Sequence, residues 1–478
     1  MKTVVAALVA VWACGSLVWA QTTDGLTSSS ESVPDVVARL NQLEAETQSL
    51  RAEVQRLRER PIRLPPVSGT ATAVDSDADV ATQPTVEELR GEMKRMAWRK
   101  GDFSVTPYGI LWGSSVYATQ RTSPGSYTMF VQSGSTGQES EFLVDGRNTR
   151  LGLDVLGPQI AWLDDAQTGG KVEIDFQNNA LNVLSGENKS SVLLRHAYVE
   201  TKNDEFRLLA GQTWDVISPL NPGMLLYSVG WCGGNIGYRR AQLRGERFWA
   251  CSDTSLLTAQ FCMASQAFVD NMSTKTPSGT LSGEPSDWPI LEGRTAWTIG
   301  DRGPDGLPIT VGLSGHIGQQ GFNYTYVDGG GKSVTDSDNR CRTWSGNLDI
   351  RIPITHRLGL QGECYVGENL GTFLGGIGQG VDPIGLNTIR DAGGWFEVWY
   401  FWTPTLHSHV GYSVDDPNDH DIHYFAGKTY NQFYYGNMIL DVTKNFQVGL
   451  EVCSWRTLYR DELPGDSVQT ECVVKYGF

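Results

Sequence analysis

The last twelve residues of the chain, from Ser467 to Phe478, read Ser-Val-Gln-Thr-Glu-Cys-Val-Val-Lys-Tyr-Gly-Phe. Counted in twos, the residues that share a face with Phe478 are mostly apolar, and those that share a face with Lys475 are mostly polar. The first face holds Val468, Thr470, Cys472, Val474, Tyr476 and Phe478, and the second holds Gln469, Glu471, Val473, Lys475 and Gly477. Side chains alternate between the two faces of a strand, so this pattern predicts a strand with one apolar face. It is about ten residues long, the length that a tilted strand needs to cross a bilayer.

The closing Phe478 and the alternation before it resemble the C-terminal strand of bacterial outer-membrane β-barrels, where a final Phe serves as the signal for the barrel-assembly machinery. An ordinary half-exposed strand at the end of a soluble protein would fit this stretch equally well. The rest of the chain favours the membrane interpretation, because no stretch after the N-terminus approaches the roughly 20 apolar residues of a membrane helix. Without such a helix, only a closed barrel satisfies the backbone in lipid, which offers no hydrogen bonds.

The composition of the 478 residues excludes one class of partner and leaves the fold class open. The 54 glycines and the 10% aromatic content suit a barrel, but they also suit large soluble β-proteins. The formal net charge is −16, and no basic tract offsets it. A surface of that charge argues against binding to nucleic acid.

Residues 1–20 read as a secretory signal peptide, with a basic Lys2, an apolar run from Val4 to Trp12, and a cleavage site after Ala20. Cleavage leaves seven cysteines in the exported chain, and no Cys-x-x-Cys occurs, so neither a metal site nor a cofactor is predicted. The seven are Cys232, Cys251, Cys262, Cys341, Cys364, Cys453 and Cys472. Alternation directs Cys453 inward and Cys472 outward, and side chains on opposite faces cannot form a disulfide.

Residues 31–60 carry the heptad pattern of an α-helical coiled coil. The apolar positions that would form the trimerisation seam are Val36, Leu40, Leu43, Leu50, Val54 and Leu57, with Thr47 interrupting them. Three pairs of opposite charge, Arg39/Glu44, Glu46/Arg51 and Glu53/Arg58, fall at g and following e positions, which favours parallel association of identical chains. A lone amphipathic helix docked on the protein's own body is the alternative, and these residues alone do not fix the number of helices.

Residues 61–100 read as a linker followed by a short helix. Pro61 ends the coiled coil, and the Pro-, Ser-, Thr- and Ala-rich stretch after it is typical of a solvated linker. Thr85-Val86-Glu87-Glu88 is a capping box for a helix that would extend to about Arg99.

Residues 101–478 repeat as hairpins, in which strand-like runs are joined by alternately short and long connections. Short connections are expected near residues 202–205, 247–253, 301–306, 355–357, 403–405 and 443–445, and one connection on that side, 157–170, is longer. Long loops are expected near residues 119–147, 177–190, 214–234, 269–290, 318–340, 368–393, 415–430 and 458–466. This sorting of turns predicts an all-β transmembrane barrel of about 16 antiparallel strands.

Three segments resemble the early strands of DcaP-type trimeric porins, and they are similar too to the phosphate-selective porin O/P group. They read Asn-Thr-Arg-Leu-Gly-Leu-Asp (148–154), Leu-Leu-Arg-His-Ala-Tyr-Val-Glu (193–200) and Phe-Arg-Leu-Leu-Ala-Gly-Gln-Thr-Trp-Asp (206–215). The resemblance implies a homotrimer in the cell outer membrane, with a periplasmic coiled coil ahead of a 16-stranded barrel. It further implies passive diffusion of small hydrophilic solutes. The seven cysteines and the segment 230–234, Gly-Trp-Cys-Gly-Gly, depart from the family pattern.

The loop at residues 214–234 follows the fifth expected strand, where trimeric porins fold their third long loop inward. The residues expected at the pore constriction are Asp215, Arg239, Arg240, Gln242 and Arg244. Arg240, Gln242 and Arg244 share one face, and a ladder of arginines in a narrow pore selects anions such as carboxylates or phosphates. Alternatively, these arginines pair with acids across the lumen, such as Asp349 or Glu363, and leave a weakly selective pore.

Other ionisable residues are expected to line the lumen, because charge facing water costs less than charge facing lipid. They are Arg195, Asp349, Arg351, Glu363, His407, His409, Glu451 and Lys475. Alternation sends His196 and Tyr198 outward, where a protein interface would tolerate them better than lipid.

The sequence does not predict an enzyme, because Gly-x-Ser-x-Gly, His-Glu-x-x-His and P-loop motifs are missing from it. His407 and His409 would need a third partner for a metal or base role. The acidic segment 415–423 could bind a cation, but charge in a long loop is normally solvated. The functional alternative to a porin is a surface adhesin with a coiled-coil stalk and a barrel anchor, although this chain has enough strands to close its own barrel.

Overall fold

The computed structural model describes residues 97–136, 138–178, 191–266, 273–275, 280–284, 286–303 and 305–478. The predicted signal peptide at 1–20, the coiled coil at 31–60 and nearly all of the 61–100 segment lie outside the described residues. In the described part of the chain, no helix is both long enough and apolar enough to cross a membrane.

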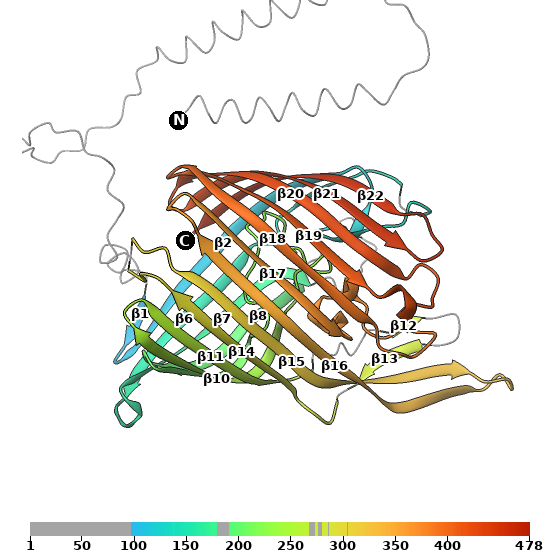
Figure 1. The fold of residues 1–478 in the computed structure, drawn as a ribbon, viewed down its shortest axis with the longest axis horizontal. Helices are drawn as coiled ribbons and strands as arrows, with labels where there is room; N and C mark the ends of the chain where they lie inside the picture. Colours follow the sequence, from blue (N-terminus) through green and yellow to red (C-terminus); the bar gives the residue numbers. More distant parts are fainter. Residues whose placement is uncertain are drawn as a thin grey trace, which may run out of the picture. The chain divides into compact units, whose positions relative to one another are not determined.

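Sixteen strands of the described chain form a closed antiparallel barrel, as the hairpin pattern predicted (Figure 1). They are β2 (Phe103–Ala118), β6 (Arg150–Ile160), β7 (Ala166–Asn178), β8 (Ser191–Lys202), β9 (Phe206–Trp214), β10 (Arg239–Ser252), β11 (Ser255–Ala264), β14 (Ile290–Ile299), β15 (Ile309–Val327), β16 (Ser333–Pro353), β17 (Leu358–Glu368), β18 (Arg390–Thr403), β19 (Leu406–Pro417), β20 (Lys428–Thr443), β21 (Phe446–Tyr459) and β22 (Gly465–Gly477). Each strand pairs with the next, and β22 pairs with β2 from Ile110↔Gly477 to Ala118↔Gln469, which closes the barrel. Closure removes the sheet edges that lipid could not satisfy.

Short elements decorate this barrel. The short strands are β1 (Trp98–Lys100), β3 (Thr122–Pro124), β4 (Thr128–Val131), β5 (Glu141–Asp145), β12 (Ser273–Lys275) and β13 (Thr280–Glu284). The single-turn 3-10 helices are η1 (Ala161–Leu163), η2 (Gly371–Phe373), η3 (Gly376–Gly378) and η4 (Asp419–Asp421). β5 pairs with the second half of β2 and β6 with the first half, so together they act as one wall strand.

The outer face of the wall is apolar and the inner face is polar, as the last strand illustrates. Val468, Val474 and Tyr476 are exposed, whereas Gln469 and Glu471 are buried. Large aromatic side chains are exposed close to the short turns, namely Trp249, Trp297, Trp402 and Tyr476. An apolar band with aromatic residues at its border is the surface that a transmembrane barrel presents to lipid.

Five of the six predicted short connections coincide with turns, whereas most of the connection predicted at 247–253 belongs to β10, which runs to Ser252. One predicted long loop is also wrong. Residues 318–340 were expected to be a loop, whereas β15 and β16 continue through them and pair until Val327↔Ser333. The connection expected at 157–170 is also shorter than predicted, because β6 runs to Ile160 and β7 begins at Ala166. Strand pairing therefore extends further into the Gly- and Asp-rich stretches than composition indicates.

The expectation that His196 and Tyr198 face outward is wrong, because the side-chain parity of β8 changes at a bulge. Glu173 of β7 pairs with His196, but the next residue, Ile174, pairs with Leu194. Arg195 is therefore the extra residue, and the positions after it reverse their faces. His196 is consequently buried on the inner side, with its Nδ1 3.0 Å from the Thr213 hydroxyl.

Candidate functional site

The connection between β9 and β10, residues 215–238, folds into the barrel; we call it the inner loop. In Figure 1 it is part of the green trace visible inside the wall. Most of its residues are buried, including Val216, Ile217, Leu225 and Trp231. The sequence predicted an inward fold for this loop from the porin resemblance.

Four glutamates of the wall accept hydrogen bonds from backbone amides of the inner loop; we call them the latch glutamates. The bonds are Val216 N to Glu292 (2.9 Å), Leu220 N to Glu363 (2.7 Å), Gly223 N to Glu397 (2.6 Å), and Leu225 N and Leu226 N to Glu451 (2.8 and 3.1 Å). A buried amide without a partner is costly, and a carboxylate is a strong acceptor. Because the four acids come from β14, β17, β18 and β21, they fix the inner loop at successive points along the wall.

Apolar contacts and glycines fit the inner loop closely against the wall. Leu225 joins a buried cluster with Trp112, Ile439 and Val473. Gly234 has a φ of +123°, and a Cβ there would lie 2.4 Å from the carbonyl oxygen of Gly394. Only glycine combines this backbone conformation with such a close approach.

Two further connections turn inward beside the inner loop. From residues 369–389, Gly376 N donates to Asp391 (2.6 Å) and Ile377 N donates to Asp415 (3.0 Å). From the first long connection, Val131 N donates to the Thr457 hydroxyl (3.0 Å). Inward-facing polar side chains thus hold loop backbone at several heights of the lumen.

The structure brings four of the five predicted constriction residues together where the inner loop meets β10, namely Asp215, Arg240, Gln242 and Arg244. The Arg240 side chain is 1% exposed and lies 2.7 Å from Asp215. Arg244 contacts Gln242 (2.8 Å) and Glu246 (3.3 Å). Arg240 and Arg244 are therefore neutralised, by Asp215 and Glu246 rather than by Asp349 or Glu363.

Arg239 is separated from the other constriction residues, because it lies among aromatic rings. Its guanidinium carbon is 4.7 Å from the ring centres of both Trp214 and Tyr238, and 5.8 Å from that of Trp231. These contacts stabilise the Arg239 cation, which forms no ion pair with an acid of the described residues. At this position Arg239 braces the base of the inner loop.

The other residues predicted to line the lumen also meet inner-face partners. Arg195 pairs with Glu173 and Asp175, Asp349 pairs with Arg294, Glu363 and Glu451 are latch glutamates, Arg351 stacks on Trp399, and Lys475 stacks on Trp112. His407 Nδ1 lies 3.1 Å from His409 Nε2, and His409 Nδ1 lies 3.4 Å from Glu397. Among the described residues, no group of three or more His, Cys, Asp or Glu side chains is placed to hold a metal ion.

Several residues with evident structural roles were missed by the sequence analysis. Glu292 and Glu397 are latch glutamates, and Tyr227 donates a 2.6 Å hydrogen bond to Asp175. Burial raises the pKa of Tyr227, so its hydroxyl remains protonated and able to donate. Strand parity could have placed Glu292 and Glu397 inward, but no pattern in the sequence links either acid to a loop amide far along the chain.

The seven described cysteines are free thiols. Cys232 lies in the inner loop and is fully buried, and this burial raises the pKa of its thiol well above the usual value. Cys453 is buried on the inner side, whereas Cys472 lies on a strand position facing the other way. Opposite faces keep these two apart, as alternation predicted.

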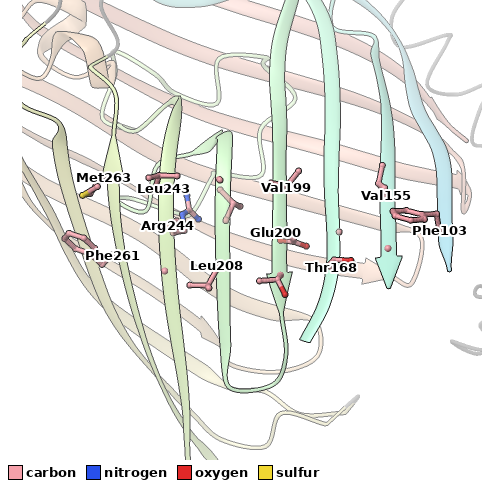
Figure 2. Close-up of a pocket in the computed structure, with 16 residues that line it drawn as sticks. Phe103, Val155, Thr168, Val199, Glu200, Leu208, Leu243, Arg244, Phe261 and Met263 are labelled. Carbon is pink, nitrogen blue, oxygen red and sulfur yellow. The ribbon is translucent and has the colours of Figure 1, made fainter. Parts of the chain in front are cut away.

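A hollow of about 780 Å³ lies on the wall formed by β6 to β11. Figure 2 shows its side chains on adjoining strands, among them Val199, Leu208, Leu243 and Phe261. These four side chains are exposed and apolar. Small residues, including Gly169 and Gly245, are among those that line it. The wall is therefore indented and apolar at this position.

No protein-family model matches the sequence, and no curated protein matches it. Solved structures match the fold, and an outer membrane channel and an anion-selective porin are among them. The outer membrane channel DcaP of Acinetobacter baumannii superposes with a TM-score of 0.60 at 18% identity, over 80% of this chain and 99% of that chain. An anion-selective porin from Comamonas acidovorans is a more distant match, with a TM-score of 0.48 at 13% identity over 79% of this chain and 100% of that chain. The chain thus has the fold of the DcaP channel, as the early strands indicated.

Proposed function

We propose that this protein is an outer-membrane porin that allows passive diffusion of small hydrophilic solutes and prefers anions, such as carboxylates or phosphates. One observation carries the proposal: the barrel presents apolar side chains outward, and ionisable side chains inward around a latched loop. A polar interior crossed by a fixed loop suits a water-filled path with a defined width. Such a path needs neither a catalytic residue nor a cofactor.

The support for an anion preference is the charge that remains on the inner wall after the ion pairs are counted. Among the described residues, Arg150, Arg351 and Lys475 contact aromatic rings, and no acid lies within ion-pair distance of them. Fixed positive charge in a narrow pore concentrates anions. Arg240 and Arg244, being paired, contribute less to this effect than their sequence positions indicate.

The support for a homotrimer comes from two parts of the chain. The charge pattern at residues 31–60 favours association of identical helices, which would lie in the periplasm. The apolar hollow on β6 to β11 offers a surface on which a second copy of the barrel could dock. Light scattering in detergent should give the mass of three chains, and Leu243→Glu in the hollow should weaken the assembly. A monomeric parent would contradict this part of the proposal.

The end of the chain supports insertion by the barrel-assembly machinery. Phe478 continues the closing seam, with its backbone N 3.0 Å from the Gly109 oxygen. Its exposed ring faces the membrane side of the wall, over Gly109. We therefore propose that Phe478 is both the last residue of the seam and the recognition signal. Deleting Phe478 should lower the amount of protein in outer-membrane fractions.

Liposome swelling tests the transport proposal. Vesicles that contain the purified protein should swell quickly in small sugars and progressively more slowly as the sugar grows. Vesicles with heat-unfolded protein provide the control. If folded protein admits no sugar of any size, passive diffusion of hydrophilic solutes is excluded.

A further inference from the structure

One side of the lumen, formed by β22, β2 and β6, brings two cations to the same aromatic ring. Lys475 pairs in register with Trp112, and Arg150 pairs with Ile110, two residues before it. The Lys475 Nζ lies 3.9 Å from the centre of the Trp112 ring, and the Arg150 guanidinium carbon lies 5.8 Å from it. Closure of the barrel thus brings its first strands, β2 and β6, and its last strand, β22, together at one site.

Neither cation is neutralised by a described acid, which distinguishes them from cations on the adjoining strands. Lys171 of β7 lies 2.8 Å from Asp154, and Arg195 of β8 lies 2.6 Å from Glu173. Of the acids nearest in the wall, Glu451 holds the inner loop, and Glu471 makes no ion pair with either cation among the described residues. Glu471 is buried with one oxygen that has no hydrogen-bond partner.

Two hydrogen-bond donors at this site have no partner among the described residues. They are the buried Arg150 Nε and Trp112 Nε1. A buried donor without a hydrogen-bond partner is destabilising. A negatively charged oxygen or a halide would satisfy such donors and both cations together, whereas a solute cation would be repelled.

The inner loop reaches the wall at the same ring. Leu225, whose amide is held by Glu451, packs against Trp112 in a buried cluster. The latched loop therefore fixes the Trp112 ring from one side, while Arg150 and Lys475 remain partly exposed. A rigid ring keeps both cations at fixed positions beside the part of the lumen that the loop narrows.

We propose that Arg150, Trp112 and Lys475 form the anion-selecting site of the lumen, and that passing anions bind there transiently. This inference rests on the proposed channel function and assigns its selectivity to residues other than Arg240 and Arg244. The site is suited to rapid exchange, because a lysine ammonium acts as a point charge and its contacts with an anion are few.

Reversal potentials across a KCl gradient test the assignment, with chloride as the probe. The parent should favour chloride, and both Lys475→Gln and Arg150→Gln should move the reversal potential toward zero. Lys475→Glu should move it further in the same direction. The matched control is the double variant Lys171→Gln with Asp154→Asn, which removes a neutral pair from the same side of the barrel and should leave the potential unchanged. Heat-modifiable mobility on gels confirms that each variant is folded.

The outcomes separate this inference from the function on which it rests. If the parent favours chloride and the Lys475 and Arg150 variants match the control, the assignment is wrong while the anion-preferring channel stands. If the folded parent favours potassium, the anion preference itself is overturned.

Discussion

Two connections on the long-loop side of the barrel are both rich in glycine, but they fold in opposite ways. The inner loop, residues 215–238, turns into the lumen and donates its amides to side chains of the wall. The connection between β15 and β16 turns away, and its amides pair with each other in a regular hairpin up to Val327↔Ser333. Both stretches are rich in glycine, so glycine content does not decide which way a connection folds.

The difference lies in where each backbone finds hydrogen-bond partners. The backbone groups of the hairpin bond to each other, because β15 and β16 pair in register. The inner loop contains two prolines, Pro219 and Pro222, and left-handed residues such as Ser218, which prevent continuous pairing. Its amides therefore donate to the latch glutamates and, elsewhere in the loop, to backbone carbonyls such as those of Phe373 and Leu374.

Removing a latch glutamate should change the position of the inner loop, and therefore the conductance, more than any other substitution proposed here. Glu451→Ala leaves two loop amides and the Asn437 amide without their acceptor. At about 1–3 kcal/mol for each unmet group, the inner loop should detach locally, and single-channel conductance should rise and become noisier. Glu451→Gln keeps one carbonyl acceptor and should change conductance less. Unchanged conductance in Glu451→Ala would mean that the latch does not hold the loop.

A substitution at Gly234 should act on the same loop through its backbone. Gly234→Ala places a Cβ 2.4 Å from the Gly394 oxygen at a φ of +123°, so we expect a loss of about 1–3 kcal/mol. The unfolding temperature, followed by gel mobility, should fall. Gly346→Ala is the matched control, since a Cβ there meets nothing within 4 Å. Equal unfolding temperatures for the two variants would contradict a tightly seated loop.

The thiol of Cys232 reports whether the inner loop is seated. Burial raises its pKa, so at pH 8 it holds less reactive thiolate than an exposed cysteine, whose pKa is about 8.5. Maleimide should modify Cys251, which is exposed, well before Cys232. In Glu451→Ala the modification of Cys232 should accelerate, as peptide mass spectrometry can determine. Fast modification of Cys232 in the folded parent would show that the loop does not stay in place.

Shortening the outer hairpin should have the smallest effect. Deleting residues 326–334 and joining Thr325 to Thr335 with a two-residue turn keeps the contact of β13 with β15, which ends at Thr280↔Thr325. Because the deleted part pairs only with itself in the described chain, conductance should stay at the parental value. A change as large as that of Glu451→Ala would refute the contrast between the two connections.

Much of the fold could be predicted from the sequence because alternation and turn length are local properties. The last strand, the short turns and the strand number follow from them. The β15–β16 hairpin could not, since Gly- and Asp-rich residues 328–332 supply a tight turn rather than a long loop. The inner-face position of His196 depends on a bulge at Arg195, where one extra residue interrupts the pairing. Strict alternation along the sequence cannot predict such a bulge.

The candidate site was less predictable, because its partners come from distant strands. Arg240 was expected to face an open constriction, but Asp215 is 25 residues earlier in the chain and neutralises it. Arg150 and Lys475 lie more than three hundred residues apart and meet only when β22 closes on β2. The alternation of residues along a strand predicts which face each side chain occupies. To predict which charges pair, one must also know the order of the strands around the barrel.

Ion conductance of the purified protein in a planar lipid bilayer tests most directly whether the polar interior is a diffusion path. Insertion should produce discrete current steps whose conductance increases in proportion to the KCl concentration, as expected for a water-filled pore. A folded protein, shown by heat-modifiable mobility, that inserts into the bilayer without carrying current would contradict the porin function.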